Sequence, residues 1–275
     1  MWAVVLLVTL CLGGERALGA RDRISMGRDY AEQEDPRFWK IIGGQEATYG
    51  EFPFMLALEY EGHSMCGASA IGDYWALTAA HCVHMMDAES MKLRAGSLKR
   101  MEGGTLHQVV RAIAHHHYQT DNTMGNDIAL LQVSQELTSN KYVKLVSLPS
   151  HTNMPLPPGT WLTVCGWGAT GSIFDHGLPP TLQRTDVLVL SKQTCQDDPT
   201  LSGHMVITDD MICAQEEGHT AYKGDSGGPL FLRSEDGDIQ VGVVSWGDFT
   251  GQQHHPTIFS RVSSHRHWIR MKSGI

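Results

Sequence analysis

From residue 41 onward the sequence is built of short apolar runs separated by Gly, Asn and Asp, and this pattern limits the available folds more than any other feature. Clear examples of such runs are Phe54–Leu58, Tyr74–Leu77, Asp127–Val133 and Val241–Ser245. Runs of this length at this spacing are typical of antiparallel strands rather than helices. The pattern predicts an all-β barrel or sandwich. Val262–Met271 is the best helix candidate and would close the chain.

The size of the chain allows one domain or two small ones. It has 275 residues, of which 41% are hydrophobic and 19% charged, so apolar material suffices for a packed core. Ser150–Gly159, rich in proline and turn residues, is the expected linker between two parts.

The first forty residues have a different character from the rest. Trp2–Leu12 is an apolar run too short to span a bilayer comfortably, and small residues follow it up to Ala20. This arrangement favours a cleaved secretory signal over residues 1–20, with an uncleaved anchor as the alternative. Residues 21–40 are charged and aperiodic, and we expect them to form a short propeptide. The mature protein would then be secreted (extracellular, luminal or in a secretory granule) and not bound to a membrane.

The net charge of −9 argues against polyanionic partners such as nucleic acid. Removing residues 1–40 leaves it unchanged, because that segment carries six basic and six acidic side chains.

Three separate segments supply the side chains for nucleophilic catalysis. They are Gly224–Pro229, Thr78–Cys82 and Asn126–Leu130, and they contain Ser226, His81 and Asp127. A serine hydroxyl is a poor nucleophile near neutral pH and needs an adjacent base, which a third group can orient. One Ser, His or Asp alone would mean little, but three in such motifs predict an activated serine.

Together with the junction Lys40–Gly44, these segments resemble the trypsin/chymotrypsin-like serine endopeptidases. The resemblance runs from Ile41 to about Trp268. It implies a protease domain over 41–275 made of two six-stranded antiparallel β-barrels, about 41–150 and about 151–275, and a C-terminal helix. His81 and Asp127 would lie on the first barrel and Ser226 on the second.

The resemblance also implies a role for each site residue. His81 would act as the base, Asp127 would orient it, and the amides of Gly224 and Ser226 would form the oxyanion hole. Cleavage after Lys40 would free the amine of Ile41, which in the family pairs with the aspartate before the nucleophile, here Asp225. Ser245, Trp246 and Gly247 match the strand that pairs with the substrate main chain.

The primary specificity pocket is expected to be uncharged. Its floor, six residues before the nucleophile, is Thr220 rather than the aspartate of trypsins, so a bound Lys or Arg would have no partner. Ala221 and Gly247 keep the walls open, whereas Thr257 replaces a wall glycine and reduces the depth. We expect cleavage after Leu, Met, Phe or smaller apolar residues. A shifted register would instead bring Glu216 or Glu217 to the pocket and favour basic residues.

The positions of the cysteines also resemble those of the family. The resemblance implies disulfides Cys66–Cys82 and Cys195–Cys213, and it leaves Cys165 without a partner, either as a buried thiol or in an intermolecular disulfide. The disulfide beside the pocket is missing, with Tyr222 and Thr250 in its place. Chymase-, granzyme- and cathepsin G-type proteases lack that same pair, and Phe259–Ser263 also looks like them.

No cofactor or metal is expected. The loop Gly96–Gln108 has one carboxylate, Glu102, whereas calcium needs six or more oxygens. His115–His117 could bind zinc, but a histidine run without a distant ligand is more often solvated.

The sequence thus predicts a monomeric serine endopeptidase made as a zymogen. Its expected partners are protein or peptide substrates, a trypsin-like activating protease and proteinaceous serine protease inhibitors. Two alternatives remain: a catalytically silent homologue that binds proteins through the same cleft, and an esterase or other acyl-transfer enzyme. The zymogen junction argues against the esterase.

Overall fold

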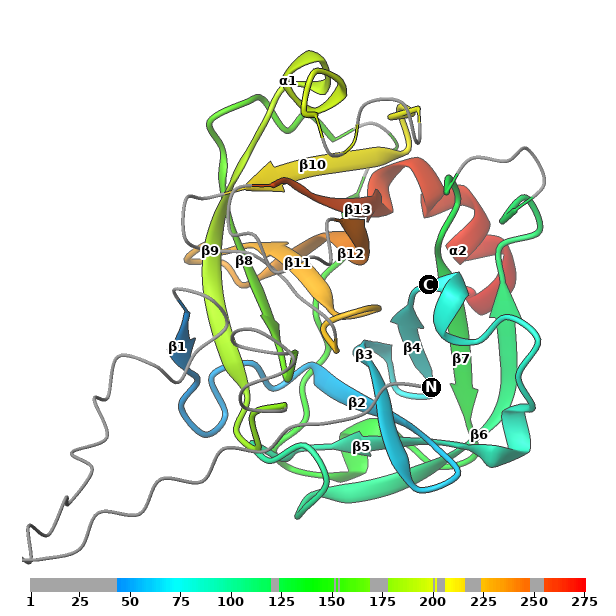
Figure 1. Ribbon diagram of the computed structural model, residues 1–275. Coiled ribbons are helices and arrows are strands. Elements are labelled where there is room, and N and C mark those ends of the chain that lie inside the picture. The colour runs from blue at the N-terminus through cyan, green and yellow to red at the C-terminus, as the bar shows by residue number, and fades with distance from the viewer. Residues whose placement is uncertain are drawn as a thin grey trace, which may run out of the picture. The chain divides into compact units, whose positions relative to one another are not determined.

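The strands of the computed structural model form two closed barrels (Figure 1). The structure describes residues 44–119, 124–150, 152, 154–168, 178–199, 201, 206–215, 224–247 and 255–275. The chain divides into Met1–Asp35, which lies outside the described residues, and Pro36–Ile275, which contains all of them. The expected signal and propeptide over 1–40 therefore remain predictions.

The first barrel closes six antiparallel strands in the order β2-β3-β4-β7-β6-β5. Their bounds are β2 Met55–Tyr60, β3 His63–Gly72, β4 Trp75–Thr78, β5 Met91–Ala95, β6 Thr105–Ala114 and β7 Ala129–Val133. Two short 3₁₀ turns lie between β4 and β5, η2 Ala80–Cys82 and η3 Ala88–Ser90, and a third, η4 Leu137–Ser139, follows β7. Three of the apolar runs in the sequence lie on β2, β4 and β7.

The second barrel also has six strands, in the order β9-β10-β13-β12-β11-β8, and closes through pairing of β8 with β9. The bounds are β8 Trp161–Gly166, β9 Gln183–Val189, β10 Met211–Gln215, β11 Pro229–Leu232, β12 Ile239–Gly247 and β13 Thr257–Arg261. A seventh strand, β1 Gln45–Glu46, pairs with β9 on the outside. β1 thus joins the second barrel although its residues precede the first. The helix α1, Lys192–Gln196, follows β9.

The chain ends in a helix that returns from the second barrel to the first. The turn η5 Val262–His265 leads into α2 Arg266–Ser273, close to the predicted helix. The helix α2 lies beside the strands of the first barrel (Figure 1). Val262, Trp268 and Ile269 belong to the hydrophobic cluster that fills this barrel. The helix ends at Gly274, whose φ of 82° is the left-handed conformation usual after a helix C-terminus.

Closure decides between the two fold classes that the strand pattern left open. Both sheets are barrels rather than layers of a sandwich, so the prediction of two six-stranded antiparallel barrels with a C-terminal helix is confirmed. The cluster that fills the first barrel also takes in Phe231 and Val243 from the second, so the two barrels share packed side chains.

Candidate active site

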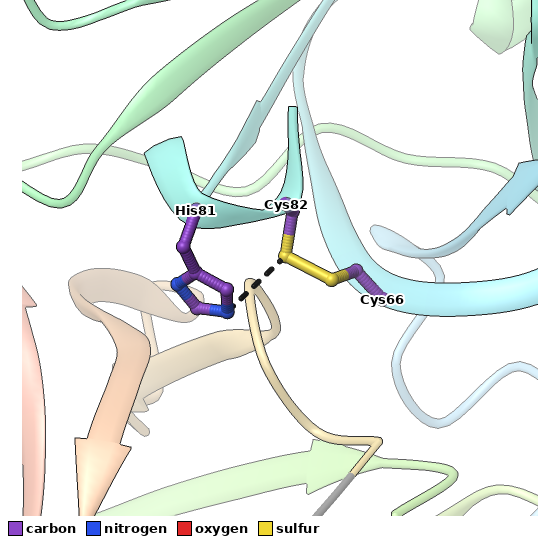
Figure 2. Close-up of side chains that lie close together, drawn as sticks. All are labelled: Cys66, His81 and Cys82. Atoms are coloured by element: carbon purple, nitrogen blue, oxygen red, sulfur yellow. Dashed lines mark hydrogen bonds between the residues drawn. A yellow bond between two sulfur atoms is a disulfide. The ribbon is translucent and has the colours of Figure 1, made fainter. Parts of the chain in front are cut away.

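His81 lies on the turn η2, directly after strand β4 of the first barrel. The disulfide Cys66–Cys82 joins this turn to β3, and Nε2 of His81 lies 3.6 Å from Sγ of Cys82 (Figure 2). Cys66, His81 and Cys82 are the one set of three clustered potential metal ligands within the described ranges. Both sulfurs are in a disulfide and offer no thiolate, so this set is not a metal site.

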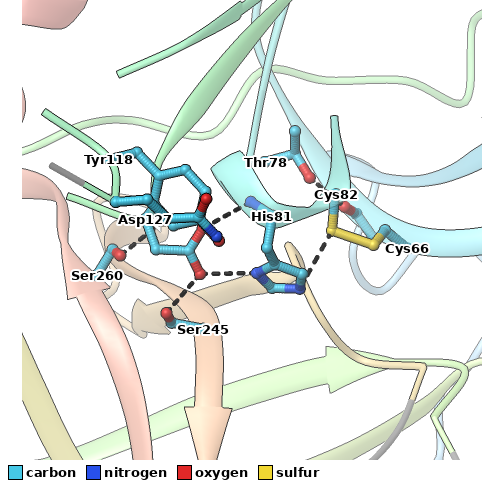
Figure 3. A network of polar contacts seen from close by, with 10 residues as sticks. Cys66, Thr78, His81, Cys82, Tyr118, Asp127, Ser245 and Ser260 are labelled. Atoms are coloured by element: carbon cyan, nitrogen blue, oxygen red, sulfur yellow. Dashed lines mark hydrogen bonds and ion pairs between the residues drawn. A yellow bond between two sulfur atoms is a disulfide. The ribbon is translucent and has the colours of Figure 1, made fainter. Parts of the chain in front are cut away.

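Asp127 is fully buried, lies two residues before β7 and faces His81. Its Oδ1 accepts a hydrogen bond from the backbone N–H of His81 at 2.8 Å, and its Oδ2 lies 2.7 Å from Nδ1 (Figure 3). A carboxylate is only an acceptor, so Nδ1 carries the proton. The lone pair of the neutral ring is therefore on Nε2, the nitrogen turned away from Asp127.

Two serines of the second barrel also bind Asp127. The hydroxyl of Ser245 donates to Oδ2 at 2.5 Å, and that of Ser260 donates to the backbone carbonyl at 2.7 Å (Figure 3). Ser245 lies where the pairing of β12 with β13 shifts register, between Val244 and Trp246. Such a bulge redirects a side chain. Ser245 can therefore point at Asp127 while the residues on either side of it in β12 stay buried.

Ser226 lies on the turn Gly224–Gly228, which we call the nucleophile turn. Its carbonyl accepts a hydrogen bond at 2.8 Å from the N–H of Gly67, the residue after Cys66. Thr78 in turn donates to the carbonyl of Gly67 at 2.8 Å. The structure therefore holds Ser226 against the corner that carries His81. Among the described residues, no hydrogen bond joins Ser226 Oγ to His81; such bonds often tighten only when substrate is bound.

Two glycines of the nucleophile turn have conformations that other residues rarely adopt. Gly224 has a φ of 103° and Gly227 a φ of 77°. A Cβ on Gly227 would also collide with the Thr78 hydroxyl. Within the described part of the chain, neither the N–H of Gly224 nor that of Ser226 has a hydrogen-bond acceptor. Both amides are therefore available to an external oxygen.

Asp225, between these two residues, is completely buried. Its Oδ1 accepts a hydrogen bond from the N–H of Gly168 at 2.7 Å. Gly166 and Gly168 line the carboxylate, and a Cβ on either would collide with it. Ile41, whose amine is proposed to pair with Asp225, and Lys40, after which the cleavage is proposed, lie outside the described residues.

The predicted pocket residues are described only in part. Trp246 pairs with Ile258 and Gly247 with Thr257 across β12 and β13. The remaining positions, Thr220, Ala221, Glu216, Glu217, Tyr222 and Thr250, lie outside the described residues. The depth and charge of the pocket therefore remain predictions.

The remaining cysteines and histidines that the sequence singled out have structural contacts of their own. The disulfide Cys195–Cys213 joins α1 to β10. Cys165 is a buried free thiol, and burial raises its pKa, so it stays protonated. The rings of His115, His116 and His117 stack on one another, with Nδ1 of His115 accepting from the N–H of His117 at 3.3 Å. This run belongs to no clustered set of metal ligands among the described residues.

Sequence reasoning missed three residues that hold the site: Thr78, Ser260 and Asp210, the last through a hydrogen bond to Asn126. Thr78 is part of the motif around His81, and that position was the available signal. Ser260 and Asp210 act on residues more than eighty positions away, and nothing local in the sequence marks them.

Comparison with known proteins agrees with this geometry. A family model described as Trypsin matches residues 41–269. Trypsin from Phaedon cochleariae is 35% identical over 243 residues, covering 86% of this chain and 89% of that protein. Trypsin delta from Drosophila erecta is 35% identical over 230 residues, with coverage of 84% and 87%. Trypsin theta from Drosophila melanogaster is 33% identical over 267 residues, with coverage of 97% and 96%.

All three relatives are named trypsins, which gives no support to the predicted chymase-, granzyme- and cathepsin G-type branch. The domain match covers most of the chain and includes His81, Asp127 and Ser226. The barrels, the buried Asp127 and the family match lead to one conclusion: this chain belongs to the trypsin family and is a serine endopeptidase.

Proposed function

We propose that this protein is a secreted endopeptidase, made as a zymogen, that hydrolyses peptide bonds with Ser226, His81 and Asp127. The observation that carries the proposal is the buried Asp127 carboxylate, which contacts both the backbone N–H and Nδ1 of His81. A buried charge with this many donors has little other use than to orient and stabilise a histidine that gains a proton.

Each step of the reaction then has a residue of this chain. Ser226 Oγ attacks the peptide carbonyl carbon while its proton passes to Nε2 of His81. His81 returns that proton to the leaving amine as the carbon–nitrogen bond breaks, which leaves an ester on Ser226. Water repeats the two proton transfers and releases the carboxylic acid. Asp127 stays ionised throughout and stabilises the imidazolium.

The oxyanion of each tetrahedral intermediate would bind to the amides of Gly224 and Ser226. Both lack an acceptor within the described part of the chain, and they flank the buried Asp225. Loss of one such donor typically costs about 3 kcal/mol of transition-state stabilisation.

Activation would act on this same turn. We propose that cleavage after Lys40 frees the Ile41 amine, which pairs with Asp225 and orders the nucleophile turn. The amine has a reference pKa of about 8, which pairing with a carboxylate should raise. Activity should therefore fall in alkali, and a profile still flat at about pH 10.5 would contradict this switch.

For specificity we propose an uncharged pocket over Thr220, narrowed by Thr257 and open at Ala221 and Gly247. Thr257 is buried and paired opposite Gly247, consistent with a place in the wall. Cleavage should follow apolar residues. The relatives are named trypsins, and a register with Glu216 or Glu217 in the pocket would give basic specificity instead.

The remaining proposals concern partners and location. Because the junction after Lys40 requires a trypsin-like cut and the pocket is proposed to be apolar, we propose activation in trans by another protease. Proteinaceous serine protease inhibitors are the other expected partners, and we propose a monomer. No helix in the described ranges is both long and apolar enough to cross a membrane. The chymase-like branch remains a proposal that rests on Tyr222, Thr250 and Phe259–Ser263.

The test is a specificity profile of the activated protein. The zymogen would be treated with trypsin, the trypsin quenched with a selective inhibitor, and the new N-terminus sequenced. The product and a Ser226→Ala control would then be given a peptide library that varies the residue before the scissile bond. Cleavage after apolar residues, absent in the control, is expected. Cleavage after Lys or Arg would overturn the pocket proposal, and no cleavage despite a free Ile41 would favour the silent binding homologue.

A further inference from the structure

A carboxylate of the second barrel holds the residue next to Asp127. Oδ2 of Asp210 accepts a hydrogen bond from the N–H of Asn126 at 2.7 Å. Asp210 lies directly before β10, 84 positions along the chain from Asn126. This contact therefore crosses from one barrel to the other, one residue away from Asp127, the carboxylate proposed to orient His81.

Asn126 has a backbone conformation that needs support. Its φ of 57° is left-handed, a region that is unfavourable for residues other than glycine although asparagine tolerates it best. The carbonyl of Asn126 accepts a hydrogen bond from the N–H of Ile128 at 2.8 Å, which closes a tight turn around Asp127. The conformation of Asn126 therefore sets the direction in which the Asp127 side chain leaves the backbone.

Asp210 is itself fixed on several sides. The Thr208 hydroxyl donates to its Oδ1, and the N–H of Arg261 donates to its carbonyl at 2.7 Å. Nε2 of His265 lies 3.9 Å from its Oδ2 and 3.3 Å from Oδ1 of Asn126. The side chain of Asp210 is only 21% exposed. Its carboxylate thus has a defined orientation and is a strong acceptor for the backbone N–H of Asn126.

We propose that Asp210 is a positioning residue for Asp127: through the N–H of Asn126 it fixes the turn that aims the Asp127 carboxylate at His81. Among the described contacts of Asp210, none is to His81 or Ser226, so it acts through Asp127. The inference rests on the proposed catalytic role of Asp127.

The first experiment compares three variants of the activated enzyme in kcat and KM on a peptide substrate. Asp210→Ala should lower kcat by about tenfold to a hundredfold with little change in KM, because a small displacement of a catalytic group has effects of that size. Asp210→Asn keeps an oxygen for the Asn126 amide and should lose no more than about fivefold. Asp209→Ala is the matched control: it removes the neighbouring acid, whose side chain is 96% exposed and pairs with Lys192.

The second experiment separates positioning from a general structural effect. Asp127→Ala and the double variant Asp127→Ala/Asp210→Ala would be compared with an activated ester substrate, which makes low rates measurable. If Asp210 acts through Asp127, its removal should cost almost nothing once Asp127 is absent. An equal loss in both backgrounds would overturn the inference.

The outcomes also distinguish this inference from the proposed function. If Asp127→Ala retained full kcat, the proposed triad would fail and the inference with it. If Asp127→Ala lowered kcat while Asp210→Ala did not, or changed only KM, the inference alone would be wrong. A loss in Asp210→Asn as large as in Asp210→Ala would also contradict it.

Should Asp210→Ala fail to fold, as judged by urea unfolding, Thr208→Val replaces it in the same two backgrounds. This variant leaves Asp210 in place but removes the hydroxyl bound to its Oδ1. A smaller fall in kcat is expected that again disappears without Asp127, and an unchanged kcat would contradict the inference.

Discussion

The turn that carries Asp127 and the nucleophile turn Gly224–Gly228 are held in different ways. Asp127 and Asn126 receive hydrogen bonds from, or donate them to, side chains of the other barrel: Ser245, Ser260 and Asp210. The nucleophile turn contacts the first barrel through its backbone, with the N–H of Gly67 on the carbonyl of Ser226. Its shape depends on glycines and on the buried carboxylate of Asp225.

This difference divides the site into two halves. We call the His81–Asp127 pair the acid half, and the nucleophile turn with its oxyanion amides the oxyanion half. None of the groups that position Asp127 lies near the activation junction in the sequence, so the His81–Asp127 pair should form with or without cleavage after Lys40. The nucleophile turn is instead proposed to change on cleavage, when the freed Ile41 amine pairs with the buried Asp225. We therefore expect barrel closure to build the acid half and activation to complete the oxyanion half.

The largest effect is expected from Asp127→Asn in the activated enzyme, with a fall in kcat of about 10⁴-fold. The amide would turn a donor or a weaker acceptor toward Nδ1 and leave His81 in the wrong tautomer. Steady-state kinetics on a peptide substrate would measure it. Asp236→Asn, at an exposed loop position, is the control and should match the parent. A loss below tenfold would show that the acid half contributes little.

Asp225→Asn should lower kcat by about 10²- to 10³-fold, the usual cost of losing an oxyanion donor. The amide cannot form an ion pair with the Ile41 amine, so the nucleophile turn would not be fixed after cleavage. Proton NMR tests whether the two halves are independent. The signal of the His81 Nδ1 proton should be the same in this variant and in the parent. Loss of that signal would show that the two halves are not independent.

A third effect concerns the stability of the folded protein at acid pH and arises from His115. The pKa of His115 is lowered from 6.5 to about 4. Burial of the ring is the largest cause, the charges of His265, His116 and His117 add to it, and Asp210 has a smaller opposing effect. Between these pH values the unfolded chain binds the proton and the folded chain does not. Stability should therefore be complete above about pH 6.5 and fall as the pH drops toward 4, by at most about 3 kcal/mol.

Urea unfolding of the Ser226→Ala protein across this range would test the effect without autolysis. His115→Phe keeps a ring against Trp268 but cannot titrate, so its stability should depend less steeply on pH. His63→Gln, at an exposed position and not among the groups that shift the His115 pKa, is the control. Equal slopes for the parent and His115→Phe would contradict the expectation.

The smallest effect is expected for Ser260→Ala, which removes one neutral hydrogen bond to the carbonyl of Asp127. A bond of this kind contributes about 1 kcal/mol, so kcat should fall by about fivefold. Ser264→Ala, nearby and exposed, should have no effect. If Ser260→Ala instead lowered kcat as much as Asp127→Asn, the inference that several groups together position Asp127 would be wrong.

The sequence predicted the strands and suggested the catalytic residues, but not the contacts that hold them. Apolar runs such as Val241–Ser245 show where strands lie, and the motifs around His81, Asp127 and Ser226 are the basis of the proposed chemistry. The bulge that aims Ser245 at Asp127 depends on the register of β12 against β13, which no local pattern sets. The contact of Asp210 with Asn126 exists only because two closed barrels meet, so it could not be read from either segment.

Labelling of Ser226 by an organophosphate, before and after cleavage at Lys40, is the most direct test of the proposed triad and activation switch. It requires the nucleophile, the base and the ordered turn together. We expect label on Ser226 after cleavage, a far slower reaction of the zymogen, and no label on Ser226→Ala. An activated protein with a free Ile41 amine and no label on Ser226 would contradict this proposal.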